Sequence, residues 1–317
     1  MALIAQLIKL QDYISRYEWD TFRYPTQYIR LKKNQWDKLY VTWSEDEEVT
    51  QTLQEELPVE EEDISVFSKI KDKFTKKKEP LDVLEEDTEE GKQELPETEL
   101  ELKQYFLDNL LNFQMKWATS TVAHRSFVRM EYYNDPILKY LLQRFPDTYL
   151  IMYHPIFTIK KAPIETDILL ISPIGIEIIH FIEYEEDAVI MAGNERTWHI
   201  ESGDKEKKVL NPIIALSRTE KIVKSILVKH ELEFDIKKTV LSRKNNIISA
   251  TDPYSTSIIG KMDYEDWFKA KRRLASPLKN TQIKAAEVLL KQCQTTSVKR
   301  PEWEEDTGPL TIMDMEE

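Results

Sequence analysis

The chain has 317 residues, of which 41% are hydrophobic, so it is long and apolar enough for one or two domains with a real core. Collagen-like, purely coiled-coil and fully disordered chains are therefore excluded. The formal net charge of −13 is unevenly distributed: residues 44–99 hold 21 acidic and 7 basic side chains, and residues 302–317 hold seven acids and no base. The rest of the chain is mildly basic, with a net charge of +8.

Several classes of site and location are also excluded or disfavoured. The single cysteine, Cys293, rules out an internal disulfide and a CxxC site. With six glycines and no P-loop, GxGxxG or HExxH pattern, a loop that cradles phosphate is not expected. No run of 18 apolar residues occurs, and the first residues lack the features of a secretory signal. We therefore predict a cytoplasmic protein.

Residues 1–43 are unusually rich in aromatic side chains, and apolar positions between Leu3 and Tyr17 fall on one helical stripe. Pro25 interrupts the pattern before a second helical run at residues 34–43. A segment this small cannot bury its own rings. We predict a helical N-terminal segment that packs on its own domain, in preference to one that binds a partner protein.

Acidic blocks dominate residues 44–95, which predicts a disordered, extended linker. Residues 64–78 interrupt it with an apolar helical face surrounded by lysines, a pattern that can bind nucleic acid or an anionic membrane surface. Because the acidic flanks cancel this charge, we favour a transient helix and do not expect peripheral membrane contact. Residues 301–317 form a second acidic stretch, a tail.

Residues 96–300 alternate helical and strand-like segments, which is typical of an α/β domain. The clearest helix is at residues 135–145, where Asp135 can cap the helix and Pro136 suits its first position. Apolar runs at 168–171 and 176–182, joined by a short turn, predict neighbouring strands inside a sheet covered on both faces. Further helices are expected at residues 97–115, 212–232, 263–274 and 280–294, and further strands at 149–154, 239–241, 247–249 and 257–261.

One part of this domain resembles a known family. Glu165-Thr166-Asp167, four apolar residues, the turn Ser172-Pro173-Ile174-Gly175, the strand that follows, Trp198 and later Asn211-Pro212 resemble the nuclease-related domain (NERD) family. That family looks like a branch of the restriction-endonuclease-like PD-(D/E)xK superfamily. The resemblance covers about residues 134–267. It implies a restriction-endonuclease-like central mixed sheet flanked by helices.

The resemblance also implies a site for phosphodiester hydrolysis, in which carboxylates hold Mg²⁺ and a lysine positions the attacking water. Carried over by position, the metal-binding aspartate is Asp167 and the helix acid is matched approximately by Asp135. The glutamate is replaced by His180 and the lysine by Ile182, which can neither accept a proton nor orient water. We expect His180 to be hydrogen bonded by Asp167 or by a backbone carbonyl.

Other residues could rebuild the site or bind nucleic acid. Lys160 and Lys161 lie just upstream of Asp167 and could supply the missing amine, whereas Glu177 and Glu183 project away from His180 by the two-residue strand period. A basic cluster near the end of the domain could contact phosphates, although complementing a helix C-terminus explains it slightly better. This cluster comprises Lys269, Lys271, Arg272, Arg273 and Lys279.

We therefore predict a nuclease-related protein that has lost Mg²⁺-dependent cleavage and acts as a nucleic-acid or protein binding or scaffolding factor. In this interpretation it is not an enzyme and needs no cofactor. The first alternative is a metal-dependent DNA endo- or exonuclease with a rearranged site, in which Asp167 would hold Mg²⁺ or Mn²⁺. The second is a protein-interaction adaptor without nucleic-acid contact.

Overall fold

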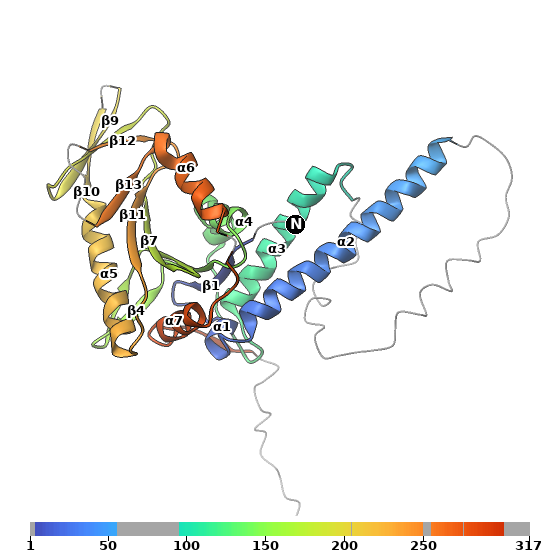
Figure 1. Ribbon diagram of the computed structural model, residues 1–317, viewed down its shortest axis with the longest axis horizontal. Coiled ribbons are helices and arrows are strands. Elements are labelled where there is room, and N and C mark those ends of the chain that lie inside the picture. Colours follow the sequence, from blue (N-terminus) through green and yellow to red (C-terminus); the bar gives the residue numbers. More distant parts are fainter. Residues whose placement is uncertain (1–3, 56–94, 204, 250–254, 275, 301–317) are drawn as a thin grey trace, which may run out of the picture. The chain divides into compact units, whose positions relative to one another are not determined.

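The structure is a computed structural model that describes residues 4–55, 95–203, 205–249, 255–274 and 276–300 (Figure 1). It contains two compact units. The first consists of Met1–Lys32 and Phe106–Glu317, and the second of Lys33–Tyr105. Two long helices contribute residues to both units: α2 (Tyr24–Glu55) and α3 (Glu99–Thr119).

A six-stranded mixed sheet forms the centre of the first unit. The strand order is β1-β3-β6-β7-β11-β13, and every neighbouring pair is parallel except the two that involve β6. Five strands therefore end at one edge, where β6 begins; we call this the carboxyl edge. The strands are β1 (Gln6–Leu10), β3 (Leu150–Tyr153), β6 (Ile168–Ser172), β7 (Gly175–Phe181), β11 (Ile236–Leu241) and β13 (Thr256–Ile259).

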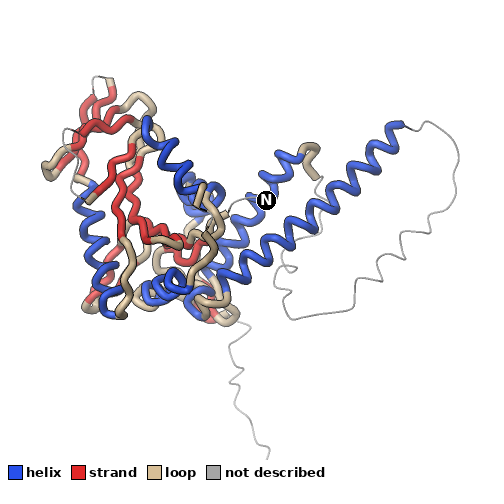
Figure 2. The backbone as a smooth tube through the Cα atoms, viewed as in Figure 1, coloured by secondary structure: helices blue, strands red, loops and turns tan. Residues whose placement is uncertain are grey.

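Helices cover both faces of this sheet, as the two apolar strand runs predicted (Figures 1 and 2). Helix α5 (Pro212–Lys229) lies on one face, and α4 (Pro136–Arg144) and α6 (Lys261–Arg272) lie on the other. The main core joins α4 to the sheet. Its members include Leu138, Leu141 and Leu142 of α4 and Ile151, Ile168, Leu170, Ile179 and Leu241 of the sheet.

The helices predicted within residues 96–300 are present, and two of them have side-chain caps. The carboxylate of Asp135 accepts the backbone N–H groups of Ile137 and Leu138 at the start of α4. The side chain of Asn211 accepts the N–H of Ile213 at the start of α5. Helix α7 (Asn280–Leu290) follows α6. No helix in the part of the chain that the structure describes is long and apolar enough to cross a membrane.

The prediction that the N-terminal segment is helical throughout is wrong for its first part. Gln6–Leu10 is the strand β1, fully buried and paired in parallel with β3. A strand buried on both faces shows no polar alternation, so its apolar run also fits a helical stripe. After the short helix α1 (Arg16–Trp19), α2 begins at Tyr24; Pro25 lies in its first turn, where proline is tolerated.

The predicted disordered linker also needs correction at its start. Helix α2 continues to Glu55, so residues 44–55 are helical. Glutamate, glutamine and leucine in this stretch favour a helix, where the high charge had suggested disorder. The remaining linker, its basic island at 64–78 and the acidic tail at 301–317 lie outside the described residues.

The aromatic residues of the N-terminal segment pack within their own units. In the first unit, Tyr17, Tyr24, Tyr28 and Phe113 have ring centroids 4.7–6.3 Å from that of Trp117. In the second unit, the indole N–H of Trp43 donates to the carbonyl of Pro96 at 2.6 Å. Each of these rings therefore packs against residues of its own unit.

Smaller sheets and hairpins complete the first unit, and most of their strands were not expected. A four-stranded sheet has the order β10-β9-β8-β12. Its strand β10 is exposed and rich in lysine, so it lacks the apolar pattern that predicts a strand. The strands of this sheet are β8 (Val189–Ala192), β9 (Thr197–Ser202), β10 (Lys205–Leu210) and β12 (Asn246–Ser249). Two further pairs of strands are separate: β4 (Ile156–Ile159) pairs with β5 (Ala162–Glu165), and β2 (His124–Arg125) pairs with β14 (Val298–Lys299).

The turn between β6 and β7 depends on Gly175. A Cβ atom at this position would lie 2.9 Å from the backbone oxygen of Asp235, which accepts the N–H of Ile176 at 2.7 Å. We expect Gly175→Ala to lower the free energy of unfolding by about 1–3 kcal/mol, because backbone must shift to make room. Urea denaturation measures this loss. Gly193→Ala is the control, since its nearest neighbouring atom is 4.0 Å away; equal losses in the two variants would contradict the steric explanation.

Candidate functional site

Asp167 lies at the carboxyl edge, directly before β6, and is 6% exposed. Because Ile168 pairs with Ile179 across the antiparallel strands, Asp167 faces His180 on β7. Its Oδ1 is 2.7 Å from Nδ1 of His180, and its Oδ2 accepts the hydroxyl of Thr219 on α5 at 2.8 Å. The backbone N–H of Asp167 also donates to the Thr219 oxygen at 3.3 Å. The result is a closed cluster of three side chains, which we call the Asp167 cluster.

This cluster can exchange a proton with a ligand through one atom. The side chain of His180 is 34% exposed, and no partner of its Nε2 lies within the described part of the chain. A carboxylate on Nδ1 fixes the orientation of the imidazole and leaves Nε2 for proton exchange. Both oxygens of Asp167 are meanwhile engaged by donors within the protein.

The helix acid of the resemblance does not join the cluster. The Oδ2 of Asp135 accepts the hydroxyl of Tyr153 at 2.6 Å. Burial, followed by this bond to Asp135, raises the pKa of Tyr153, so the hydroxyl stays protonated and donates. Tyr153 and Ile168 belong to the core under α4. Asp167 directly precedes Ile168, so its side chain points to the opposite face of the sheet, where it contacts Thr219 of α5. Asp135 and Asp167 therefore lie on opposite faces of the sheet.

The two lysines suggested for a rearranged site lie away from Asp167. Lys160 and Lys161 are exposed at the tip of the β4–β5 hairpin, with φ angles of 50° and 70°. Asp167 follows the opposite end of that hairpin, and strands of four residues span about 13 Å. At the position of the missing lysine, Ile182 is buried. The structure thus brings Asp167 and His180 together but leaves Lys160 and Lys161 apart from them.

Two nearby acids, Glu177 on β7 and Glu183 two residues after the end of β7, serve the opposite face, as the strand period predicted. Glu177 accepts the hydroxyl of Thr239 at 2.6 Å and the indole N–H of Trp267 at 3.0 Å. Glu183 accepts two hydrogen bonds from the guanidinium of Arg243, at 2.6 and 2.8 Å. The sequence carries no signal for Thr219 or Arg243, because they lie 52 and 60 residues from their partners.

The predicted phosphate-contacting cluster lies in and beyond the last turn of α6. Lys271 forms an ion pair with the buried carboxylate of Glu177, so its charge is used within the domain. Lys269 pairs with Glu265 one turn earlier, and the guanidinium of Arg272 lies 5.5 Å from the ring of Phe268. Arg273 and Lys279 are exposed. For the residues from Lys269 to Arg273, the position at the C-terminal end of α6 fits the interpretation based on the helix dipole, whereas Lys279 is the N-cap of α7.

Comparisons with known proteins add one short similarity. No family model matches the chain, and no solved structure matches it. Over 40 residues the chain is 50% identical to a protein described as an RNA 2',3'-cyclic phosphodiesterase from Geobacillus stearothermophilus. The match covers 13% of this chain and 13% of that relative. Within the described residues, no group of three or more His, Cys, Asp or Glu side chains is arranged to hold a metal ion.

Proposed function

We propose that the chain is a nuclease-related domain protein on a restriction-endonuclease-like sheet, whose Asp167 centre has become a hydrogen-bonded cluster. It acts as a nucleic-acid binding factor rather than as a Mg²⁺-dependent nuclease. The observation that carries the proposal is the double engagement of the Asp167 carboxylate by His180 and Thr219. Mg²⁺ requires several oxygen ligands in octahedral geometry, and the nearest matching acid, Asp135, serves the other face of the sheet.

Exposed cations near the cluster support nucleic acid as the partner. Helix α5, which supplies Thr219, presents Arg218, Lys221 and Lys224 to solvent. These positions lie within two turns of one another, so their charges act on one stretch of ligand. Lysine and arginine side chains that neutralise phosphates release counterions, which provides affinity without reading the base sequence.

Two assays test this function. Purified protein with Mg²⁺ or Mn²⁺ is expected to leave linear, nicked and single-stranded DNA uncut. Fluorescence anisotropy with duplex DNA is expected to show binding that weakens with salt. In the double variant Lys221→Ala/Lys224→Ala, the slope of the logarithm of the binding constant against the logarithm of the salt concentration is expected to become less steep by about two. Lys237→Ala, an exposed lysine on β11, is the control. Asp167-dependent cutting would refute the proposal, and salt-independent or absent binding would favour the adaptor.

A phosphodiesterase acting on 2',3'-cyclic RNA ends is a second candidate function. It is favoured by the 40-residue similarity together with the free Nε2 of His180. In this reaction His180 would take a proton from the water that attacks phosphorus. The bond from phosphorus to one ribose oxygen would break, and His180 would return the proton to that oxygen, which leaves a hydroxyl and a phosphate monoester on the ribose. Hydrolysis of 2',3'-cyclic AMP that falls by a factor of about 100 or more in His180→Gln would support it. No turnover above buffer would eliminate this candidate.

A further inference from the structure

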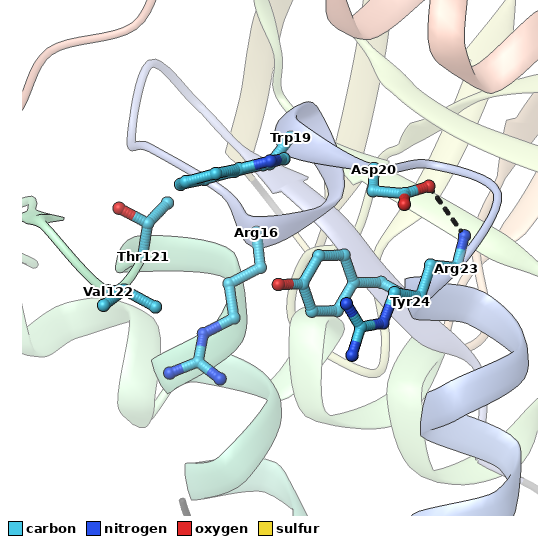
Figure 3. A pocket seen from close by; sticks show the side chains of 7 residues that line it. All are labelled: Arg16, Trp19, Asp20, Arg23, Tyr24, Thr121 and Val122. Carbon is cyan, nitrogen blue, oxygen red and sulfur yellow. Dashed lines mark hydrogen bonds between the residues drawn. The ribbon is translucent and has the colours of Figure 1, made fainter. Parts of the chain in front are cut away.

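A separate pocket lies at the start of the chain, remote in sequence from the Asp167 cluster. It has a volume of about 170 Å³, which is room for several water molecules or for a phosphate group. Its lining comes from α1, from the turn between α1 and α2, from the first residue of α2 and from the segment after α3 (Figure 3). The lining residues are Arg16, Trp19, Asp20, Arg23, Tyr24, Thr121 and Val122.

The unusual residue of this pocket is Arg16, a buried cation without an acid. Arg16 is 7% exposed, and its guanidinium lies 5.5 Å from the ring of Trp117. Its buried Nε has no hydrogen-bond partner, and no acidic side chain pairs with it in the described part of the chain. A buried guanidinium without a counter-charge is costly. Burial and then the positive charge of Arg300 lower the pKa of Arg16.

Two further arginines make the region more positive. The Nε of Arg300 is also buried without a partner. Arg23 is exposed in the pocket lining, and Figure 3 shows the hydroxyl of Tyr24 pointing toward the side of the pocket where Arg16 lies. The acid of the lining, Asp20, uses its Oδ1 to accept the N–H groups of Phe22 and Arg23 at 3.1 and 2.9 Å. Its charge therefore serves the turn rather than Arg16.

An aromatic surface accompanies the cations. The side chain of Trp19 lines the pocket and is 74% exposed. A nucleobase can stack on such a ring while its phosphate accepts hydrogen bonds from guanidinium groups. We propose that this pocket binds the terminal phosphate of a nucleotide, with Arg16 and Arg23 as phosphate ligands and Trp19 as the stacking surface. The proposal does not rest on the function assigned to the Asp167 cluster.

Isothermal titration calorimetry of the full chain at fixed ionic strength tests the proposal. The probes are inorganic phosphate, AMP and a short oligothymidylate with and without a 5'-phosphate. Arg16→Met is expected to weaken phosphate and AMP binding by a factor of about 10 to 100. In the wild type, stacking on Trp19 is expected to make the affinity for AMP about fivefold or more higher than that for inorganic phosphate. Trp19→Ala is expected to remove this difference. Arg30→Met, an exposed arginine further along α2, is the control and should bind like the wild type.

The probes also distinguish the source of the phosphate. AMP binding alone identifies a free nucleotide, whereas binding that requires the 5'-phosphate of the oligonucleotide identifies a strand end; either supports the proposal. Without ligand, Arg16→Met should melt at or above the wild-type temperature, because it removes an unpaired buried charge. If that variant does not fold, exposed Arg23→Gln should weaken binding by about three- to tenfold. No binding of any probe, or equal binding by the Arg16 or Arg23 variant and the Arg30 variant, would overturn the proposal.

Discussion

Arg243→Ala is expected to lower the free energy of unfolding by about 3–5 kcal/mol, one of the two largest effects of a single substitution in this protein. The guanidinium of Arg243 donates to both oxygens of Glu183, and the two side chains are 17% and 12% exposed. It also lies 4.5 Å from the ring centroid of Tyr140. Alanine would leave the carboxylate of Glu183 buried without its counter-charge.

Urea denaturation of the wild type and of Arg243→Ala measures this loss. The control is Lys237→Ala, which removes an exposed ion pair with Asp235 and should cost no more than about 1 kcal/mol. A loss for Arg243→Ala as small as that of the control would show that Glu183 is compensated in another way.

The pH dependence provides a second check on the same pair. Burial acts to raise the pKa of Glu183, but the hydrogen bonds and charge of Arg243 outweigh it and hold this pKa below its usual value. A carboxyl group of this kind stabilises the fold above its unfolded pKa, about 4.3, and loses that contribution as the pH falls through its folded pKa. In Arg243→Ala, burial alone should raise the pKa of Glu183. The difference in free energy of unfolding between the wild type and Arg243→Ala should therefore become smaller below about pH 5 in denaturation curves. A difference that grows on acidification would contradict the assignment of the effect to Glu183.

Glu177→Ala is expected to have an effect of similar size, about 3–5 kcal/mol. The side chain of Glu177 is 7% exposed and joins the sheet to α6 through Trp267 and Lys271, while also accepting the hydroxyl of Thr239. Its removal leaves three donors without an acceptor, including the ammonium of Lys271, which is 23% exposed.

Thermal or urea denaturation checks this expectation. Glu265→Ala on the same helix removes an exposed partner of Lys269 and should change stability by less than about 1 kcal/mol. Glu177→Gln should lose an intermediate amount, because the amide oxygen can still accept one of the donors but carries no charge. A glutamine variant as unstable as the alanine variant would mean that the ion pair with Lys271, rather than the hydrogen bonds, holds α6.

Local patterns predicted the parts of the fold and site whose partners lie close in sequence. The turn between β6 and β7 is short, so the strand period was enough to place His180 opposite Asp167 and to turn Glu177 and Glu183 away. The cap Asp135 followed by Pro136 located α4 for the same reason. These are contacts within about 15 residues, for which spacing alone determines geometry.

Long-range partners could not be predicted in this way. Thr219 reaches Asp167 only because α5 crosses back over the sheet, and the sequence does not reveal where a helix lies on a sheet. Strand β1 was missed because a short buried strand and one turn of an amphipathic helix have the same apolar composition. No motif in the sequence marks Arg16, and only tertiary packing shows that it is buried without an acid.

The position of β1 has a consequence for how the protein is made. Among the strands that the structure describes, Gln6–Leu10 pairs with Leu150–Tyr153 alone, about 140 residues further along the chain. At typical rates of translation, this apolar strand leaves the ribosome roughly 7–28 s before its partner exists. During that interval it is an open template for wrong pairing, so the yield of folded protein should depend on chaperone supply and on the speed of elongation more than on the stability of the finished fold.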